Sequence, residues 1–237
     1  MNADCRLALA GAEEGTSVAA HGVCEKNAQG KYNLLRRRRR KPRPRPSCEK
    51  NAQGKYDMLR ALVAAVEDRH RYAQGHSLRV SAWAVATARA LGLDAQRLPI
   101  LSYAGELHDI GNMAVPDDIL NAPRPITPSE WAVVRQHPVS GIRMLEHFAF
   151  LSLALPAIRH HHERFDGRGY PDGLSGSAIP REARIMAVVD SYDAMTSFRP
   201  QRTPLPHEAA AAELRRCAGT RFDPDCVEAF LELLGDG

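Results

Sequence analysis

From about residue 55 onward, the apolar residues of the chain recur with the spacing of amphipathic helices. Leu62, Val63 and Val66 share one face of the first such segment. No segment alternates between apolar and polar residues as a half-buried strand does. The pattern therefore predicts an all-α domain over residues 55–237. Further helical stripes lie at residues 78–91, 98–107, 151–162, 185–192 and 227–234.

Local signals predict where some of these helices begin and end. Thr127-Pro128-Ser129-Glu130 has the form of a capping box with proline at the first helical position. The helix that starts there is expected to run toward His137, where Pro138 bends or ends it. Asp223-Pro224 predicts a second capped start. Between the helices, the Gly- and Pro-rich residues 166–180 predict a long loop.

The N-terminal part contains an internal repeat, because residues 24–32 recur without change as residues 48–56. Solenoid repeats need three or more units to bury a shared core, so two copies favour a recent duplication or an artefact. Between the copies, residues 36–46 combine like charges with prolines and are expected to be extended and solvated. We expect residues 1–54 to form a disordered basic segment and residues 55–237 to form the functional domain.

Composition limits the function classes that remain. Eight positive charges lie between Arg36 and Arg45, so the net charge of +4 belongs to this run and the rest of the chain is acidic. The run lacks interleaved aromatic residues, so a nucleic-acid partner is not expected. The five cysteines form no CxxC pair, which is typical of a reducing compartment. No signal peptide or membrane span is recognisable, and we expect a soluble cytoplasmic protein.

Seven possible metal ligands gather at predicted helix ends or behind an apolar run. Each of them alone could simply cap or solvate a helix end. Five of the ten histidines in such places make coincidence a poor account. Imidazole and carboxylate donors without thiolates suit Mn, Fe, Zn or Co, and seven ligands exceed the needs of one ion. Two ions that share a carboxylate can activate water and bind a phosphate ester, so the set predicts phosphoester hydrolysis. The seven are His76, His108, Asp109, His137, His161, His162 and Asp190.

The ordered motifs of residues 57–232 resemble those of the HD-GYP family. The matching motifs are His108-Asp109-Ile110-Gly111, His161-His162-Glu163, Gly169-Tyr170-Pro171, Gly75-His76, His137-Pro138 and Asp190-Ser191-Tyr192-Asp193. The resemblance implies an all-α, HD-superfamily helical bundle with a long Gly/Pro-rich active-site loop. It also implies hydrolysis of the bacterial second messenger cyclic di-GMP to linear pGpG and then GMP.

The resemblance further implies a role for each matching residue. His76, His108, Asp109 and Asp190 would hold one divalent ion, and Asp109 would bridge to a second ion held by His137, His161 and His162. The position of a third-metal acid is occupied by Tyr72, so two ions, iron or manganese, are expected. Arg199 and Arg202 would contact substrate phosphate. Gly169 and Tyr170 would line the substrate pocket or a surface for a diguanylate cyclase partner, and a homodimer is a further expectation.

Two departures from the family pattern bear on catalysis. The lysine that usually follows His-Asp-Ile-Gly is Asn112 here, and the tyrosine of Arg-Pro-Tyr-Arg is Gln201. With His108 and Asp109, Asn112 is the predicted catalytic group, and loss of the lysine charge can cost ~10²–10³ in rate. Two alternatives therefore stay open: a weak or inactive module that binds cyclic di-GMP or a cyclase, and a phosphohydrolase for another nucleotide.

Overall fold

The computed structural model describes residues 25–26, 32–33, 46–69, 74–198 and 203–235. The chain divides into two compact units, Met1–Pro46 and Ser47–Gly237. The described residues of the first unit form a short antiparallel ladder between β1 (Glu25–Lys26) and β2 (Tyr32–Asn33). The expected Arg-rich linker, at residues 36–45, lies outside the described residues.

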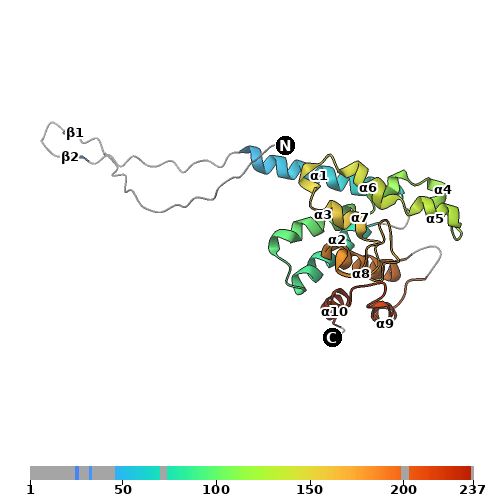
Figure 1. The fold of residues 1–237 in the computed structure, drawn as a ribbon. Helices are drawn as coiled ribbons and strands as arrows, with labels where there is room; N and C mark the ends of the chain where they lie inside the picture. Colours follow the sequence, from blue (N-terminus) through green and yellow to red (C-terminus); the bar gives the residue numbers. More distant parts are fainter. Residues whose placement is uncertain (1–24, 27–31, 34–45, 70–73, 199–202, 236–237) are drawn as a thin grey trace, which may run out of the picture. The chain divides into compact units, whose positions relative to one another are not determined.

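The described part of the second unit is built from helices and single helical turns (Figure 1), which confirms the predicted all-α class. None of the helices in the described segments is long and apolar enough to cross a membrane. The helices are α1 (Pro46–Arg69), α2 (His76–Ala90), α3 (Leu98–Leu107), α4 (Asp117–Leu120), α5 (Pro128–Val134), α6 (His137–Leu145), α7 (Leu155–His160), α8 (Arg181–Thr196), α9 (His207–Cys217) and α10 (Pro224–Leu233). The turns are η1 (Ala95–Arg97), η2 (Ile110–Ala114), η3 (Ala149–Leu151) and η4 (Gly176–Ala178).

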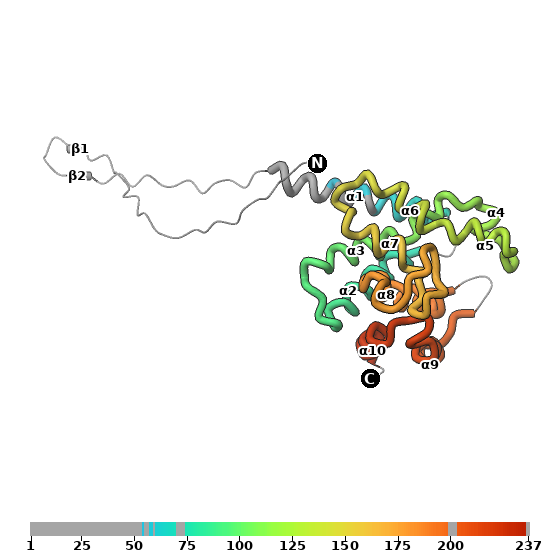
Figure 2. Tube along the Cα trace, in the orientation of Figure 1, coloured from blue at the N-terminus to red at the C-terminus, as the bar shows by residue number. Residues whose placement is uncertain are grey.

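Helix α8 lies at the centre of this unit and packs against α2, α7, α9 and α10 (Figure 2). Its apolar residues are buried almost all round, as expected of a helix enclosed by others. Helix α2 packs closely on α3 at Gly105, which has no side chain. A Cβ added to Gly105 would lie 2.5 Å from the Cα atom of Ser81, too close for any larger residue. Phe230 of α10 closes the core, with its ring edge-to-face against Trp83 and Tyr192. The packing thus brings the ends of several helices around α8.

Two predicted boundaries are wrong, and proline explains both. Helix α5 ends at Val134, and His137 begins α6 rather than closing the capped helix. Pro138 takes the first turn of α6, where the missing N–H would have no intrahelical partner. In the same way Pro156 lies in the first turn of α7, so the segment predicted as one helix over residues 151–162 is α-helical only from Leu155 to His160, after the short turn η3 that ends at Leu151.

Other local predictions are confirmed. The side chain of Thr127 accepts a hydrogen bond from the Glu130 backbone, and the capping box is complete. Asp223 caps α10 by accepting from the backbone N–H of Asp225.

The predicted domain boundary at residue 55 does not coincide with the start of a helix. Helix α1 begins at Pro46, so residue 55 falls within it. The second copy of the repeat therefore lies in a helix, whereas residues 25–26 and 32 of the first copy belong to the ladder.

Candidate metal centre

Three of the predicted ligands are fixed by one local arrangement. Each histidine follows the end of a helix, and its Nδ1 lies within hydrogen-bonding distance of the carbonyl oxygen three residues earlier. The last carbonyls of a helix have no intrahelical donor, so this bond satisfies both groups. Nδ1 must be the donor, which leaves the lone pair on Nε2. The pairs are His108 with Gly105 (2.9 Å), His137 with Val134 (2.9 Å) and His161 with Ile158 (2.7 Å).

His76, the first residue of α2, is held by a carboxylate instead. Its Nδ1 lies 2.7 Å from Oδ2 of Asp193 in α8. Arg79 donates to the same carboxylate from Nε, at 2.6 Å from Oδ1. At the start of α2, the carboxylate of Glu67 accepts from the backbone N–H groups of Gly75 and Ser77, at 2.9 and 3.0 Å. Asp193 and Glu67 thus set the position and ring orientation of His76, and neither was among the predicted site residues.

The Nε2 atoms of these histidines converge in pairs. His76 and His108 approach to 3.3 Å between their Nε2 atoms, and so do His137 and His161. With the Nδ1 protons engaged elsewhere, the neutral rings have no proton to share between the two Nε2 atoms. Two nitrogens bound to one ion at ~2.1 Å lie about 3 Å apart, so the spacing suits a shared cation. The donor set therefore fits a divalent metal.

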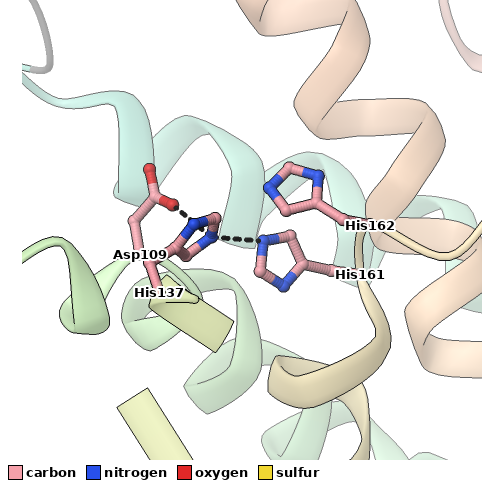
Figure 3. Close-up of side chains that lie close together, drawn as sticks. All are labelled: Asp109, His137, His161 and His162. Carbon is pink, nitrogen blue, oxygen red and sulfur yellow. Dashed lines mark hydrogen bonds and ion pairs between the residues drawn. The ribbon is translucent and has the colours of Figure 1, made fainter. Parts of the chain in front are cut away.

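Asp109 joins the two histidine pairs. Its Oδ1 lies 3.4 Å from Nε2 of His137, and its Oδ2 lies 3.7 Å from Nε2 of His108. Two groups result in which the possible ligand atoms all lie within 4.8 Å of one another, and Asp109 belongs to both. One contains His76, His108 and Asp109, and the other contains Asp109, His137, His161 and His162 (Figure 3).

Asp190 of α8 completes the gathering, because its Oδ1 lies 3.4 Å from Nε2 of His76 and 3.9 Å from Nε2 of His108. The structure thus brings all seven predicted ligands together. A cation could be held by either group.

Two glycines of the motifs allow this convergence. A Cβ added to Gly111 would lie 1.8 Å from the carbonyl oxygen of His137, so only glycine lets η2 reach the first turn of α6. A Cβ added to Gly169 would lie 2.5 Å from the Cα atom of Glu163. Gly169 therefore packs against backbone and does not line the cavity described below. Both glycines are required for close approach of two backbones rather than for chemistry.

Glu163 shapes the loop that follows the histidine pair. Its buried carboxylate accepts from the backbone N–H groups of Asp172 and Gly173, at 2.7 and 3.0 Å. The loop is thereby folded back, and the ring of Tyr170 stacks on His162 with 4.9 Å between the centroids. Glu163 is thus a third supporting residue, after Asp193 and Glu67, that was not among the predicted site residues.

Burial keeps most of the imidazoles neutral. It lowers the pKa of His162 to about 4 and lowers the pKa values of His137 and His161 as well. Burial opposes ionisation of Asp109, but the surrounding imidazoles hold the pKa of this carboxyl well below its usual range. At His76 burial acts to lower the pKa, but the hydrogen bond to Asp193 and the charges of Asp190, Asp109 and Asp193 together outweigh it, and the pKa is raised. At neutral pH the cluster thus presents an ionised Asp109 and neutral imidazoles at His137, His161 and His162, the forms that metal binding requires.

A cavity of about 640 Å³ opens on the cluster, within the range of small-molecule sites. Asn112 is buried and lines it, as do Tyr170 and Asp190. Arg199, Gln201, Arg202 and Tyr72, which the sequence singles out, lie outside the described residues. The lining of the cavity further includes Trp131, Glu213 and Arg221, which were not among the predicted site residues.

Known proteins are similar to this chain in sequence and in fold. The family model described as HD domain matches residues 60–226. Over 173 residues the chain is 43% identical to the cyclic di-GMP phosphodiesterase response regulator RpfG of Xanthomonas campestris. This match covers 72% of this chain and 46% of that protein. It is 35% identical, over 173 residues, to the 3'3'-cGAMP-specific phosphodiesterase 2 of Vibrio cholerae, covering 72% of this chain and 33% of the relative.

The chain therefore spans less than half the length of these two curated relatives. Among solved structures, Bd1817, an HD-GYP-type protein of Bdellovibrio bacteriovorus, superposes with a TM-score of 0.56 at 22% identity. The match covers 68% of this chain and 51% of that one, and it shows the fold alone.

Proposed function

Since the chain belongs to the HD domain family, we propose that it is a metal-dependent phosphodiesterase that hydrolyses cyclic di-GMP to pGpG, GMP or both. The observation that carries the proposal is Asp109, whose two carboxylate oxygens face two separate groups of imidazole nitrogens. A shared carboxylate between two ligand groups is the arrangement of dinuclear phosphoesterases. The 43% identity to a curated cyclic di-GMP phosphodiesterase favours this substrate.

Two divalent ions, iron or manganese, would occupy the two groups. His76, His108, Asp109 and Asp190 would hold one ion, and Asp109, His137, His161 and His162 the other. When bound, such ions would polarise the phosphoryl oxygens and lower the pKa of water toward 7, which supplies a nucleophile at neutral pH. The three backbone carbonyls that accept from Nδ1 fix the rings in the tautomer that leaves Nε2 free.

The other cavity residues have supporting roles in the proposed reaction. Asn112 lies in the wall next to the cluster and would donate its amide N–H to a phosphoryl oxygen. Tyr170 stacks on His162 and would limit where the substrate enters. Burial, together with the charges of Asp109 and Asp190, raises the pKa of the Tyr170 hydroxyl, so this group stays protonated and can donate. Arg199 and Arg202 keep their predicted role as phosphate contacts.

The test is turnover by the purified protein loaded with manganese or iron under anaerobic conditions. Cyclic di-GMP should be converted to pGpG or GMP, and chromatography of the reaction mixture measures the conversion. The variants His108→Ala and Asp109→Ala should lose activity by several orders of magnitude, whereas His147→Ala, at an exposed position outside the cluster, should keep it. Equal turnover by wild type and Asp109→Ala would refute the proposal.

Asn112 favours a second candidate, a module that binds the nucleotide with little turnover. In that case the metal-loaded protein would bind cyclic di-GMP in calorimetry yet cleave it slowly, and Asn112→Lys would raise kcat about tenfold or more. If Asn112→Lys changed neither binding nor rate, this residue would not explain weak activity.

The relative from Vibrio cholerae that is named for 3'3'-cGAMP favours a third candidate, the same chemistry on another cyclic dinucleotide. A panel of cyclic di-GMP, 3'3'-cGAMP and cyclic di-AMP separates the substrates by kcat/KM. The diguanylate cyclase partner and the homodimer stay predictions. Cross-linking and light scattering of the purified protein, with and without a cyclase domain, would check them.

A further inference from the structure

Two arginines lie near the cavity over the metal centre, Arg135 against the ring of Tyr170, which lines the cavity, and Arg221 in the lining itself. The guanidinium carbon of Arg135 lies 4.6 Å from the centroid of the Tyr170 ring. Arg221 lines the cavity, with its guanidinium carbon 5.1 Å from the ring centroid of Phe222. Both side chains are exposed, so their N–H groups can meet a ligand. The sequence motifs assign no role to either residue.

Neither guanidinium has a carboxylate partner within 4.0 Å in the described part of the chain. Several other arginines there are paired, for example Arg164 with Asp166 at 2.6 Å. Glu213 also lines the cavity, but it is held by Arg216 at 2.6 Å and does not neutralise Arg221 within ion-pair distance. Positive charge is therefore available at the cavity, next to the ring that stacks on His162.

The contacts of Arg135 and Arg221 leave their hydrogen-bond donors free. A guanidinium that lies over an aromatic ring uses its face for the contact, and its N–H groups point outward in the plane. The fork of donors matches two oxygens of a phosphate. Aromatic contacts also reduce the side-chain freedom that would be lost on binding. The arginines are thus partly ordered for an anion before it arrives.

We propose that Arg135 and Arg221 bind the second phosphodiester of a cyclic dinucleotide, the one that is not at the metal ligands. This inference rests on the proposed function. A cyclic dinucleotide carries two phosphodiesters, and hydrolysis takes one of them to the cluster. The other would meet Asp109 and Asp190 across the cavity unless cations bind it, and the two arginines supply that charge.

The geometry around Tyr170 supports the short separation of the two subsites. One ring contact of Tyr170 is with the predicted metal ligand His162, at 4.9 Å between centroids, and another is with the guanidinium of Arg135, at 4.6 Å from the Tyr170 centroid. Arg221 lines the same cavity as Asp109 and Tyr170. A molecule that contacts Tyr170 can therefore reach both groups, as a compact two-phosphate ring must.

The experiment compares a substrate with two phosphodiesters and a substrate with one. Cyclic di-GMP and bis(p-nitrophenyl) phosphate are cleaved by the manganese-loaded wild type, Arg135→Ala, Arg221→Ala and the double variant. We expect each single variant to raise KM for cyclic di-GMP about tenfold, with kcat changed less than threefold. The loss in kcat/KM should be at least fivefold smaller for bis(p-nitrophenyl) phosphate, which has no second phosphate.

Controls separate phosphate binding from damage to the fold. Arg143→Ala removes an exposed arginine of α6 that does not line the cavity, and its KM should match that of the wild type. Arg135→Lys and Arg221→Lys keep the charge and lose the fork, so they should recover part of the affinity. Calorimetric binding of cyclic di-GMP to each metal-loaded variant measures the subsite even if turnover is slow.

The outcomes distinguish this inference from the proposed function. If the wild type cleaves or binds cyclic di-GMP and both alanine variants do so with unchanged KM and Kd, the phosphate subsite is refuted and the proposed function stands. Equal losses on both substrates would also refute the subsite, because they indicate a general structural effect. If the wild type neither binds nor cleaves the cyclic dinucleotide, the proposed function fails and takes the subsite with it.

Discussion

Replacement of Asp193 by asparagine tests how a residue that lies outside the seven predicted ligands controls the metal centre. Oδ2 of Asp193 accepts the Nδ1–H of His76 at 2.7 Å and an N–H of Arg79 at 3.0 Å, and Oδ1 accepts from Nε of Arg79 at 2.6 Å. Asparagine offers one acceptor oxygen in place of two. If that oxygen faces His76, the amide N–H₂ faces Arg79 and is repelled. If it faces Arg79, His76 loses its acceptor and can turn.

The expected magnitudes follow from this geometry. Loss of the outer partner of a metal-binding histidine typically costs 10–100-fold in metal affinity or activity, so we expect a loss of that order for the ion at His76 and His108. Loss of one partner of a buried ion pair costs about 3–5 kcal/mol, but the side chain of Arg79 is 43% exposed and solvent screens the pair. We therefore expect the free energy of unfolding to fall by about 1–3 kcal/mol.

The pH dependence has a defined sign. Burial opposes ionisation of Asp193, but His76 and Arg79 hold its pKa well below its usual range. The stabilisation is therefore complete above the unfolded pKa of about 4 and is lost as the pH falls further. The difference in unfolding free energy between wild type and Asp193→Asn should be largest between about pH 5 and 6.5, because Asp193 also raises the pKa of His76 and that part of the stabilisation is lost at higher pH. It should shrink at more acidic pH.

The assay is calorimetric titration of the metal-free protein with manganese, combined with metal analysis and urea unfolding. Asp172→Asn is a matched control, because Asp172 accepts from Arg159 at 2.7 and 2.8 Å and from His160 at 2.9 Å, yet belongs to neither ligand group. This control should lose stability without losing metal. If Asp193→Asn kept its metal affinity within twofold while its stability fell, the positioning role of Asp193 would be wrong.

Three further outcomes are expected. Gly111→Ala should prevent metal binding and lower the unfolding free energy by at least about 3 kcal/mol, roughly the upper end for overpacking, because the added Cβ would lie 1.8 Å from the carbonyl oxygen of His137. Metal analysis and urea unfolding of the variant measure the two effects. Glu67→Gln should cost about 1 kcal/mol and speed hydrogen exchange at Gly75, because it weakens the cap of α2. In chelator, stability should fall as the pH drops from about 6.5, since burial lowers the pKa of His162 to about 4 and the unfolded chain takes up the proton first; urea unfolding at several pH values measures it.

The sequence predicts the metal-ligating residues better than the residues that hold those ligands in position. Histidines such as His108 and His161 stand out because they follow helical stripes, and a side chain just past a helix end can reach a free carbonyl three residues back. Asp193 and Glu67 could not be assigned in this way, because their partners lie 117 and 8 to 10 residues away and depend on how helices pack. The contact of Arg135 with Tyr170 likewise appears only once α5 and the Tyr170 loop are placed together.

Local sequence is also insufficient for some elements of the fold. The same nine residues lie within α1 in the second copy of the repeat and contribute to a β ladder in the first. Identical side chains cannot account for this difference, so the flanking residues must. In the second copy the apolar stripe of Leu62, Val63 and Val66 follows directly, and burial of Val63 and Val66 favours continuation of the helix. The first copy is followed by the Arg-rich run, which offers no such stripe.

The two halves of the metal centre differ in what supports them. In one half, His76 is bonded to a carboxylate, and Asp190 stands 3.4 Å from its Nε2, so negative charge accumulates around His76 and His108. In the other half, His137 and His161 are bonded to neutral carbonyls, and Asp109 is the carboxylate of that ligand group. Carboxylate partners raise the basicity of an imidazole more than carbonyl partners do. If both groups hold an ion as proposed, the group around His76 would favour a hard divalent ion more strongly, and the group around His161 would depend more on the shared Asp109.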